Sequence, residues 1–244
     1  MQTATGATLD AKRIVALTAC IAVGVLFWNQ PFLVPLKLLV VAMHESGHAV
    51  ASLISGGSVK EIVISADQSG HCLSMERASF FTQVLTYSGG YVGSAIAGAL
   101  LILLTFRFKA QKAVLYAMAI WLLVVGVIYA GNGFTRIFCL GSAVVIGLLA
   151  RVLPKGVTEV VNLFLGAFTA LYALFDLRDD LWHWDSRQSD AALLANITYI
   201  PALIWAVLWS AASVAVLGLS LWWSLRKGRS GSALSMPPLA LRKL

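Results

Sequence analysis

One short stretch of the chain, residues 40–57 (VVAMHESGHAVASLISGG), carries three ionisable side chains in an otherwise apolar run. His44 and His48 are four residues apart, so on an α-helix both imidazoles project from one face, about one turn apart. That separation allows two imidazoles to bind one zinc ion. Glu45 points about a quarter-turn away, where it can reach a water on the metal rather than the metal itself, as a general base must. The motif therefore predicts metal-assisted hydrolysis, with His44 and His48 as ligands and Glu45 as the catalytic base.

Chance and purely structural explanations of this HExxH motif are both weak. With four His and four Glu in 244 residues, random placement would produce the pattern in roughly one chain in a thousand. Each ionisable group in lipid costs on the order of 3 kcal/mol. A purely structural role, in which the three groups only hydrogen-bond inside a helix bundle, does not explain why the chain carries this cost. We therefore favour a zinc hydrolase.

A catalytic zinc site usually has three protein ligands and one open position, so the motif requires one more ligand. Asp176, Asp179, Asp180 and His183 follow one another at helical spacing, on one face that begins where an apolar run ends. Asp176 comes directly after ALYALF and is the acid nearest the hydrocarbon, hence the most costly to leave unpaired. Asp176 is the leading candidate for the third metal ligand, Asp180 or Asp179 is the alternative, and His183 comes last. These acids could instead form a solvated helix end that pairs with nearby arginines.

The composition places these residues in a membrane protein. Hydrophobic residues make up 59% of the chain and charged residues 12%, with a mean hydropathy of +0.83. The net charge of +7 comes largely from Lys and Arg between and after the apolar runs, which is typical of membrane anchoring and does not indicate nucleic acid as a partner. Cys20, Cys72 and Cys139 form no CxxC pair and no disulfide framework.

Seven apolar runs have a length that can cross a bilayer, or nearly so. They are residues 14–28, 36–54, 87–106, 113–130, 134–150, 157–175 and 200–225. We therefore expect an all-α polytopic membrane protein with about six to seven transmembrane helices. Residues 1–227 should form a single membrane-embedded domain, and residues 228–244, rich in Ser, Gly and Pro, a disordered tail.

Two connecting features should position the motif helix. Residues 58–65 (SVKEIVIS) alternate like a strand, residues 66–70 supply a turn and residues 71–75 can return as a second strand, which predicts a short β-hairpin with His71 at the surface. The glycine-rich run SGGYVGSAIAG spaces Gly89 from Gly93, and Ser94 from Gly98, by four residues. Such pairs favour close packing against another helix, here the motif helix. Asn132 and Asn162 are expected to hydrogen-bond between helices.

The motifs AMHESGHAVASLISGG, YSGGYVGS, LFDLRDD and SDAALLANIT together resemble the site-2-protease-like membrane metallopeptidases, in particular a predicted peptidase branch of that group. The resemblance covers roughly residues 36–215. It implies an integral membrane zinc peptidase with His44 and His48 as ligands, Glu45 as the catalytic residue, and an Asp of a later helix completing the metal site. Better-studied members place that Asp in Leu-Asp-Gly, whereas the matching stretch here reads Phe175-Asp176-Leu177.

Two functions follow as hypotheses. The first is a membrane-embedded zinc endopeptidase that cuts a membrane or juxtamembrane segment of a protein substrate. The alternative is a non-catalytic metal-binding membrane protein, either a degenerate protease or a transporter. A transporter is expected to show repeated halves or broken half-helices, and neither is evident in the sequence. The expected partners are a membrane protein or peptide substrate and the lipid bilayer.

The Lys and Arg residues also bear on orientation. With seven spans, seven of them fall on the side of the hairpin, among them Lys12 and Arg13, ten fall on the opposite side, and Lys37 is left unassigned. The positive-inside rule then predicts that the C-terminus is cytoplasmic and the hairpin is outside. The family resemblance implies the opposite orientation.

Overall fold

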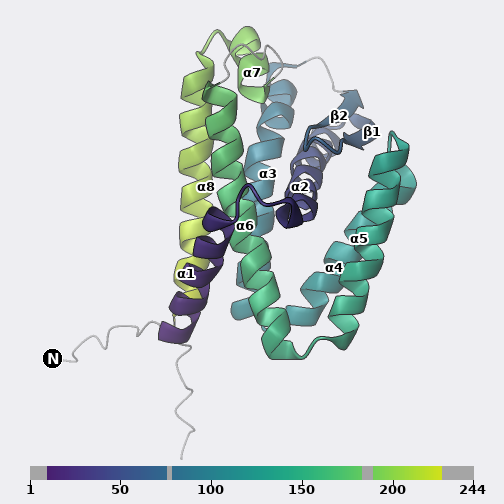
Figure 1. Ribbon diagram of the computed structural model, residues 1–244. Helices are drawn as coiled ribbons and strands as arrows, with labels where there is room; N and C mark the ends of the chain where they lie inside the picture. Colours follow the sequence, from purple (N-terminus) through teal and green to yellow (C-terminus); the bar gives the residue numbers. More distant parts are fainter. Residues whose placement is uncertain (1–9, 76–78, 183–188, 227–244) are drawn as a thin grey trace, which may run out of the picture.

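The computed structural model describes residues 10–75, 79–182 and 189–226; the side chains of residues 173, 174 and 176–182 lie outside this description. The described chain is mostly helical, with one small sheet (Figure 1). In chain order its elements are α1 (Ala11–Leu26), a 3-10 turn (Pro31–Leu33), α2 (Val34–Ile54), β1 (Ser58–Ile64), β2 (Gly70–Met75), α3 (Phe80–Phe106), α4 (Gln111–Val124) with a π-helical turn (Val125–Tyr129), α5 (Gly133–Val152), α6 (Lys155–Trp182), α7 (Asp190–Thr198) and α8 (Ala202–Leu225).

Within the described residues, four helices are long and apolar enough to cross a membrane: α3, α4 with its π-helical turn, α5 and α8. The pair formed by α1 and residues 31–54 gives a fifth span if it is counted as one, because the two helices are bent by 120° at a short break. Pro31 stands at that break, where its missing N–H group and fixed φ suit the start of a new helical segment. The described residues therefore give four or five candidate membrane spans, fewer than the six to seven transmembrane helices predicted from the sequence.

Helix α3 is the centre of the bundle and packs against α2, α6 and α8. Its contact with α2 is a backbone contact made by glycines. A Cβ atom on Gly47 would collide with the carbonyl oxygen of Gly89, and one on Gly93 would lie 2.9 Å from the Cα of Gly47. This confirms the prediction that the glycine-rich run packs against the motif helix. Gly98, further along α3, faces α6 instead, where a Cβ would lie 3.1 Å from the carbonyl oxygen of Gly166.

Strands β1 and β2 form the predicted antiparallel hairpin, with one irregularity of register between Val59 and Glu61. The outer edge of β1 meets the junction of α4 and α5, where Ile62 pairs with Ala130 in a parallel bridge. The amide of Ile64 donates to Oγ1 of Thr135 at 2.7 Å. The hairpin is thus held between the motif helix and the far helix pair, and it does not hang free at the membrane surface (Figure 1).

The two asparagines have different roles. Asn162 of α6 donates to Oγ1 of Thr105 on α3 at 2.9 Å, which confirms the predicted hydrogen bond between helices. The prediction for Asn132 is wrong, because this side chain caps α5 and accepts from the amide of Thr135 at 2.7 Å. An Asn directly before a helix is well suited to satisfying a first-turn amide.

At one end of the bundle, α1 and α6 begin and α3 and α8 end. Arg13 marks this place: its guanidinium donates to the carbonyl oxygen of Ser224 at 2.7 Å, lies 3.8 Å from Glu159, and covers the ring of Phe106 at 4.7 Å. The assignment of Lys12 and Arg13 to the side of the hairpin is therefore wrong. The physical reason is the bend of 120° between α1 and residues 31–54, because the prediction treated the two apolar runs as separate straight spans.

Candidate metal centre

Helix α2 places His44 and His48 as the motif predicts, on one face and one turn apart. Their ring centroids are 4.8 Å apart and the ring planes are inclined by 70°. Both side chains are largely buried, with 15% of His44 and 9% of His48 exposed. The two imidazoles can therefore direct their Nε2 atoms at a common point.

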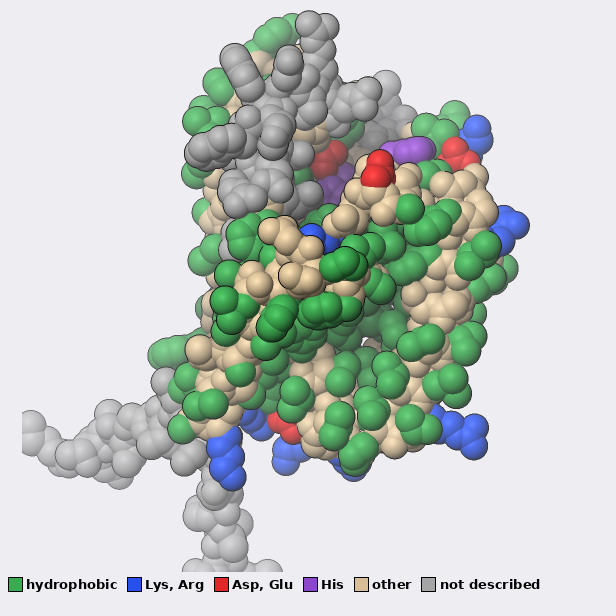
Figure 2. Space-filling view, viewed as in Figure 1, with side chains coloured by type: hydrophobic (Ala, Val, Ile, Leu, Met, Phe, Trp, Pro, Cys, Tyr) green, Lys and Arg blue, Asp and Glu red, His purple; other side chains and the backbone are tan. Residues whose placement is uncertain are grey.

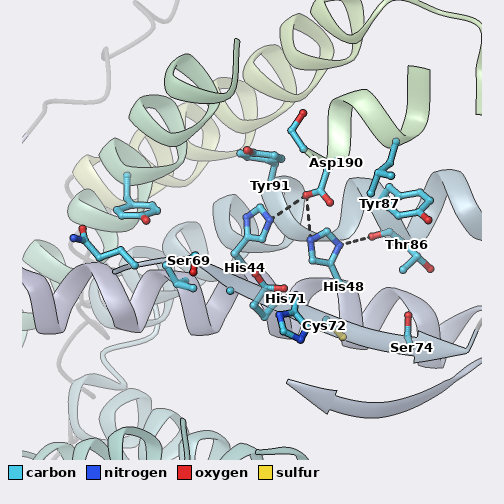
Figure 3. Close-up of a pocket in the computed structure, with 17 residues that line it drawn as sticks. His44, His48, Ser69, His71, Cys72, Ser74, Thr86, Tyr87, Tyr91 and Asp190 are labelled. Atoms are coloured by element: carbon cyan, nitrogen blue, oxygen red, sulfur yellow. Dashed lines mark hydrogen bonds and ion pairs between the residues drawn. The ribbon is translucent and has the colours of Figure 1, made fainter. Parts of the chain in front are cut away.

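The carboxylate that meets these imidazoles belongs to Asp190, in the first turn of α7. Its Oδ2 atom lies 3.1 Å from Nε2 of His44 and 3.1 Å from Nε2 of His48 (Figure 3). The local sequence begins the helix here because Ser189 acts as the N-cap, its hydroxyl accepting from the amide of Ala192 at 3.3 Å. The carboxylate therefore projects from a fixed helix start toward the imidazoles of α2.

The tautomer of His48 is set by its second ring nitrogen. Nδ1 lies 2.7 Å from the carbonyl oxygen of Thr86, and because a carbonyl can only accept, Nδ1 must carry the proton. A neutral His48 then presents the lone pair of Nε2 to Asp190, so two acceptors face each other at 3.1 Å. Such an arrangement requires a cation between them, either a proton or a metal ion. A metal-binding His commonly donates its other ring N–H to a carbonyl in this way.

The three side chains also fit a metal ion by geometry. Their ligand atoms all lie within 4.8 Å of one another, and tetrahedral zinc with bonds of about 2.1 Å separates its ligand atoms by about 3.4 Å. Space for an ion is kept by Gly90 of α3, since a Cβ atom there would collide with Nε2 of both His44 and His48. Two imidazoles and one carboxylate are a donor set that catalytic zinc uses.

Glu45 lies beside this group but is not a member of it. Its side chain is 6% exposed and reaches toward the hairpin, where a Cβ on Gly70 would lie 2.7 Å from Oε1 of Glu45. Glu45, both histidines and Asp190 line one cavity of about 420 Å³, bounded by α2, β2, α3 and the start of α7. His71 of β2 is exposed, as predicted, and it also borders this cavity (Figure 3).

An aromatic stack holds the two sides of the centre together. The ring of Tyr91 on α3 meets His44 edge to face, with centroids 4.7 Å apart, and stacks on Trp209 of α8 at 5.2 Å. The indole N–H of Trp209 donates to Oγ of Ser88 at 3.1 Å. Leu194 of α7 is buried in the same apolar cluster. The helix that carries Asp190 is therefore packed on α3 and α8, which fixes the carboxylate relative to the imidazoles.

The protonation state of Asp190 also suits a metal ligand. Burial by itself raises the pKa of this carboxyl group. When a proton is the cation between the two groups, the charge of the doubly protonated His48 and the hydrogen bonds from both imidazoles outweigh burial and hold the pKa below its usual value. Asp190 is therefore ionised at neutral pH, as a carboxylate ligand must be.

The acids favoured from sequence are not tested by these contacts. Asp176, Asp179 and Asp180 belong to α6, but their side chains lie outside the described part of the chain, as does all of His183. The choice of Asp176 or Asp180 as a ligand stays a prediction. Asp190 was missed, although it stands in the motif SDAALLANIT. An acid at the first position of a helix is common because it favours the helix dipole, so its place in the sequence indicated a cap and not a ligand.

A family model described as Peptidase M50B-like matches residues 17–220. Comparison with curated proteins and comparison with solved structures gave no match. The matched range contains the motif helix, the hairpin, the glycine-rich helix and the helix that carries Asp190. The chain therefore belongs to the Peptidase M50B-like family.

Proposed function

We propose that this chain is a membrane-embedded zinc metallopeptidase that hydrolyses a peptide bond in or near a membrane segment of a protein substrate. The observation that carries the proposal is the position of Asp190, one oxygen of which lies 3.1 Å from Nε2 of both His44 and His48. The peptidase family of the chain and its long apolar helices support the same function.

His44, His48 and Asp190 would hold the zinc ion, and the cavity that all three line has room for a water molecule beside them. When bound, zinc would lower the pKa of a water molecule to about 7 and polarise the carbonyl group of the substrate. The chain itself orients the imidazole rings of the two histidines. Thr86 fixes the ring of His48 through its carbonyl oxygen, and Tyr91 fixes the ring of His44 by edge-to-face contact.

Glu45 would act as the general base. Its carboxylate shares the cavity with the three ligand side chains, and it can take a proton from the attacking water and pass it to the leaving amine nitrogen. A buried carboxylate suits this task, because little bulk water competes for the proton. The substrate chain would enter the cavity beside β2, whose residues Gly70 and His71 form part of its wall.

The test is the zinc content and the activity of the purified protein in one preparation. The parent should hold about one zinc ion per chain and cleave a reporter membrane segment, while His44→Ala should lose metal and activity together, since two remaining ligands fall short of the usual three. An activity that survives removal of all metal by a chelator would overturn the proposal. So would a His44→Ala variant that keeps its zinc.

A further inference from the structure

We propose a binding site for an anionic phospholipid on the side of α2 that faces away from the metal centre. One acyl chain would lie in an apolar groove between α2, α3 and α4, with the phosphate group at the cations of the loop that follows α3. This proposal does not depend on the peptidase activity.

The groove is a hollow of about 600 Å³ with almost no polar lining. Its α3 wall runs from Leu85 to Leu104, which corresponds to about 28 Å at about 1.5 Å of rise per residue. The hydrocarbon core of a bilayer is about 30 Å thick. The groove therefore follows α3, a candidate membrane-spanning helix, over nearly the whole apolar depth.

The lining of the groove suits an acyl chain. Such a chain is apolar along its whole length and needs no hydrogen-bond partner, which fits a lining made of residues such as Val50, Ile96, Val114 and Ala117.

The charges at one end of the groove identify the headgroup. Leu104 lines the groove one turn before Arg107, and Val114 lines it two residues after Lys112. The amide of Ala110 donates to the carbonyl oxygen of Leu104 at 3.0 Å, which folds the loop back against the end of α3. Cations on this loop therefore lie at the mouth of the groove.

A second loop adds to the same cationic surface. Nζ of Lys112 donates to the carbonyl oxygen of Arg151 at 3.1 Å, so the loop between α5 and α6 lies beside the loop between α3 and α4. The segments 107–112 (RFKAQK) and 151–155 (RVLPK) together hold five cations and no acid. Figure 2 shows Lys and Arg side chains gathered along the lower edge of the molecule, below the apolar belt. Such a surface attracts anionic lipids.

The groove is distinct from the catalytic cavity although both are formed by α2. His44, Glu45 and His48 point to the cavity, whereas Met43, Ser46 and Gly47 line the groove. The bond from Nε1 of Trp121 to Oγ of Ser46, at 3.1 Å, ties α4 to α2 within the groove lining. A bound acyl chain would lie directly behind the helix that carries the motif.

The test compares phosphatidylglycerol with phosphatidylcholine of identical acyl chains, bound from an equimolar mixture and counted by native mass spectrometry of the purified protein. The parent should retain about tenfold more phosphatidylglycerol, because the cations at the mouth of the groove attract its net negative headgroup more strongly than the zwitterionic headgroup of phosphatidylcholine. Combining Arg107→Gln, Lys109→Asn and Lys112→Gln should bring the ratio close to one. The matched control, Lys60→Gln with Arg136→Gln, removes cations at the end of the bundle that carries the hairpin and should keep the ratio of the parent.

A second pair of variants tests the groove itself. Ala117 of α4 is exposed and lines the groove, so Ala117→Phe should fill it and reduce the retention of both lipids. Ala113→Phe adds the same ring at an exposed α4 position outside the groove lining and should change nothing. A parent ratio near one, or a ratio that the three cation substitutions leave unchanged, would overturn the proposal. A dimer that Ala117→Phe splits into monomers would also overturn it, because the groove would then be an interface between copies.

Discussion

Nε2 of His44 and Oδ2 of Asp190 lie 3.1 Å apart although 146 positions separate them in the chain. The contact joins the motif helix to a short helix near the last span, so the fold brings together groups that no local pattern connects. Four predictions test what this arrangement does, the first three at and around the centre and the last on its place in the membrane.

The first prediction concerns the third metal ligand. Asp190→Asn keeps the shape of the side chain but removes its charge, so we expect at least a tenfold loss of zinc affinity. Asp176→Asn makes the same change at the acid that the sequence favoured and should leave zinc affinity unchanged. Competition with a chelator of known affinity measures both variants. If Asp176→Asn loses zinc while Asp190→Asn retains it, the third ligand lies on α6.

The second prediction separates chemistry from metal binding. Glu45→Gln is nearly isosteric and leaves His44, His48 and Asp190 in place, so the variant should hold as much zinc as the parent. Its amide cannot take a proton, so cleavage should fall by about 100-fold or more. Zinc stoichiometry and cleavage of a reporter membrane segment are measured on the same samples. Cleavage at the rate of the parent would favour a role for Glu45 other than water activation.

The parts of the site that could be predicted from sequence are those with a local cause. The spacing of His44 and His48 follows from helix geometry alone, and the hairpin follows from alternation over residues 58–65. Asp190 depends on tertiary packing, since α7 is held beside the motif helix by its contacts with α3 and α8, where Leu194 is buried in one apolar cluster with Tyr91 and Trp209.

The bend between the first two helices was beyond prediction for a similar reason. Residues 14–28 and 36–54 both have the composition of a membrane span, and neither run by itself determines the angle between the two helices. The angle is fixed by contacts with a distant helix, where the ring of Trp28 lies 5.6 Å from Phe168 and 5.7 Å from Tyr172 of α6. Periodicity and composition report on single helices and not on such contacts.

The third prediction tests the space beside the imidazoles. Gly90→Ala would place a Cβ against Nε2 of both His44 and His48, so the variant should lose zinc and activity even though alanine favours the helix. Gly141→Ala is the matched control, because a Cβ on Gly141 of α5 meets nothing within 4 Å. It should keep the zinc content of the parent and be equally or slightly more stable to heat. A Gly90→Ala protein with full zinc content would show that the imidazoles have room to move.

The last prediction is the orientation of the molecule in the membrane. Among the side chains that the structure describes, eight cations lie at the end of the bundle where α1 begins and α8 ends, and two lie at the end with the hairpin. Lys37, in the first turn of α2 beside the bend, is assigned to neither end. The first group is Lys12, Arg13, Arg107, Lys109, Lys112, Arg151, Lys155 and Arg226, and the second is Lys60 and Arg136. By the positive-inside rule the first end is cytoplasmic. The metal centre, beside the hairpin, should therefore open toward the opposite side.

Chemical labelling of single cysteines in intact cells can measure this orientation. Ala66→Cys lies in the exposed turn of the hairpin, and Gly156→Cys lies at an exposed position of α6 where a Cβ meets nothing within 4 Å. Cys72→Ser removes the half-buried native thiol of β2, while Cys20 and Cys139 are buried. A membrane-impermeant maleimide should label Ala66→Cys directly and Gly156→Cys only after the cells are permeabilised. The reverse pattern would place the hairpin and the metal centre toward the cytoplasm, as the resemblance to site-2 proteases implies. The excess of cations at the other end of the bundle would then require another cause, such as binding to lipids of the opposite leaflet.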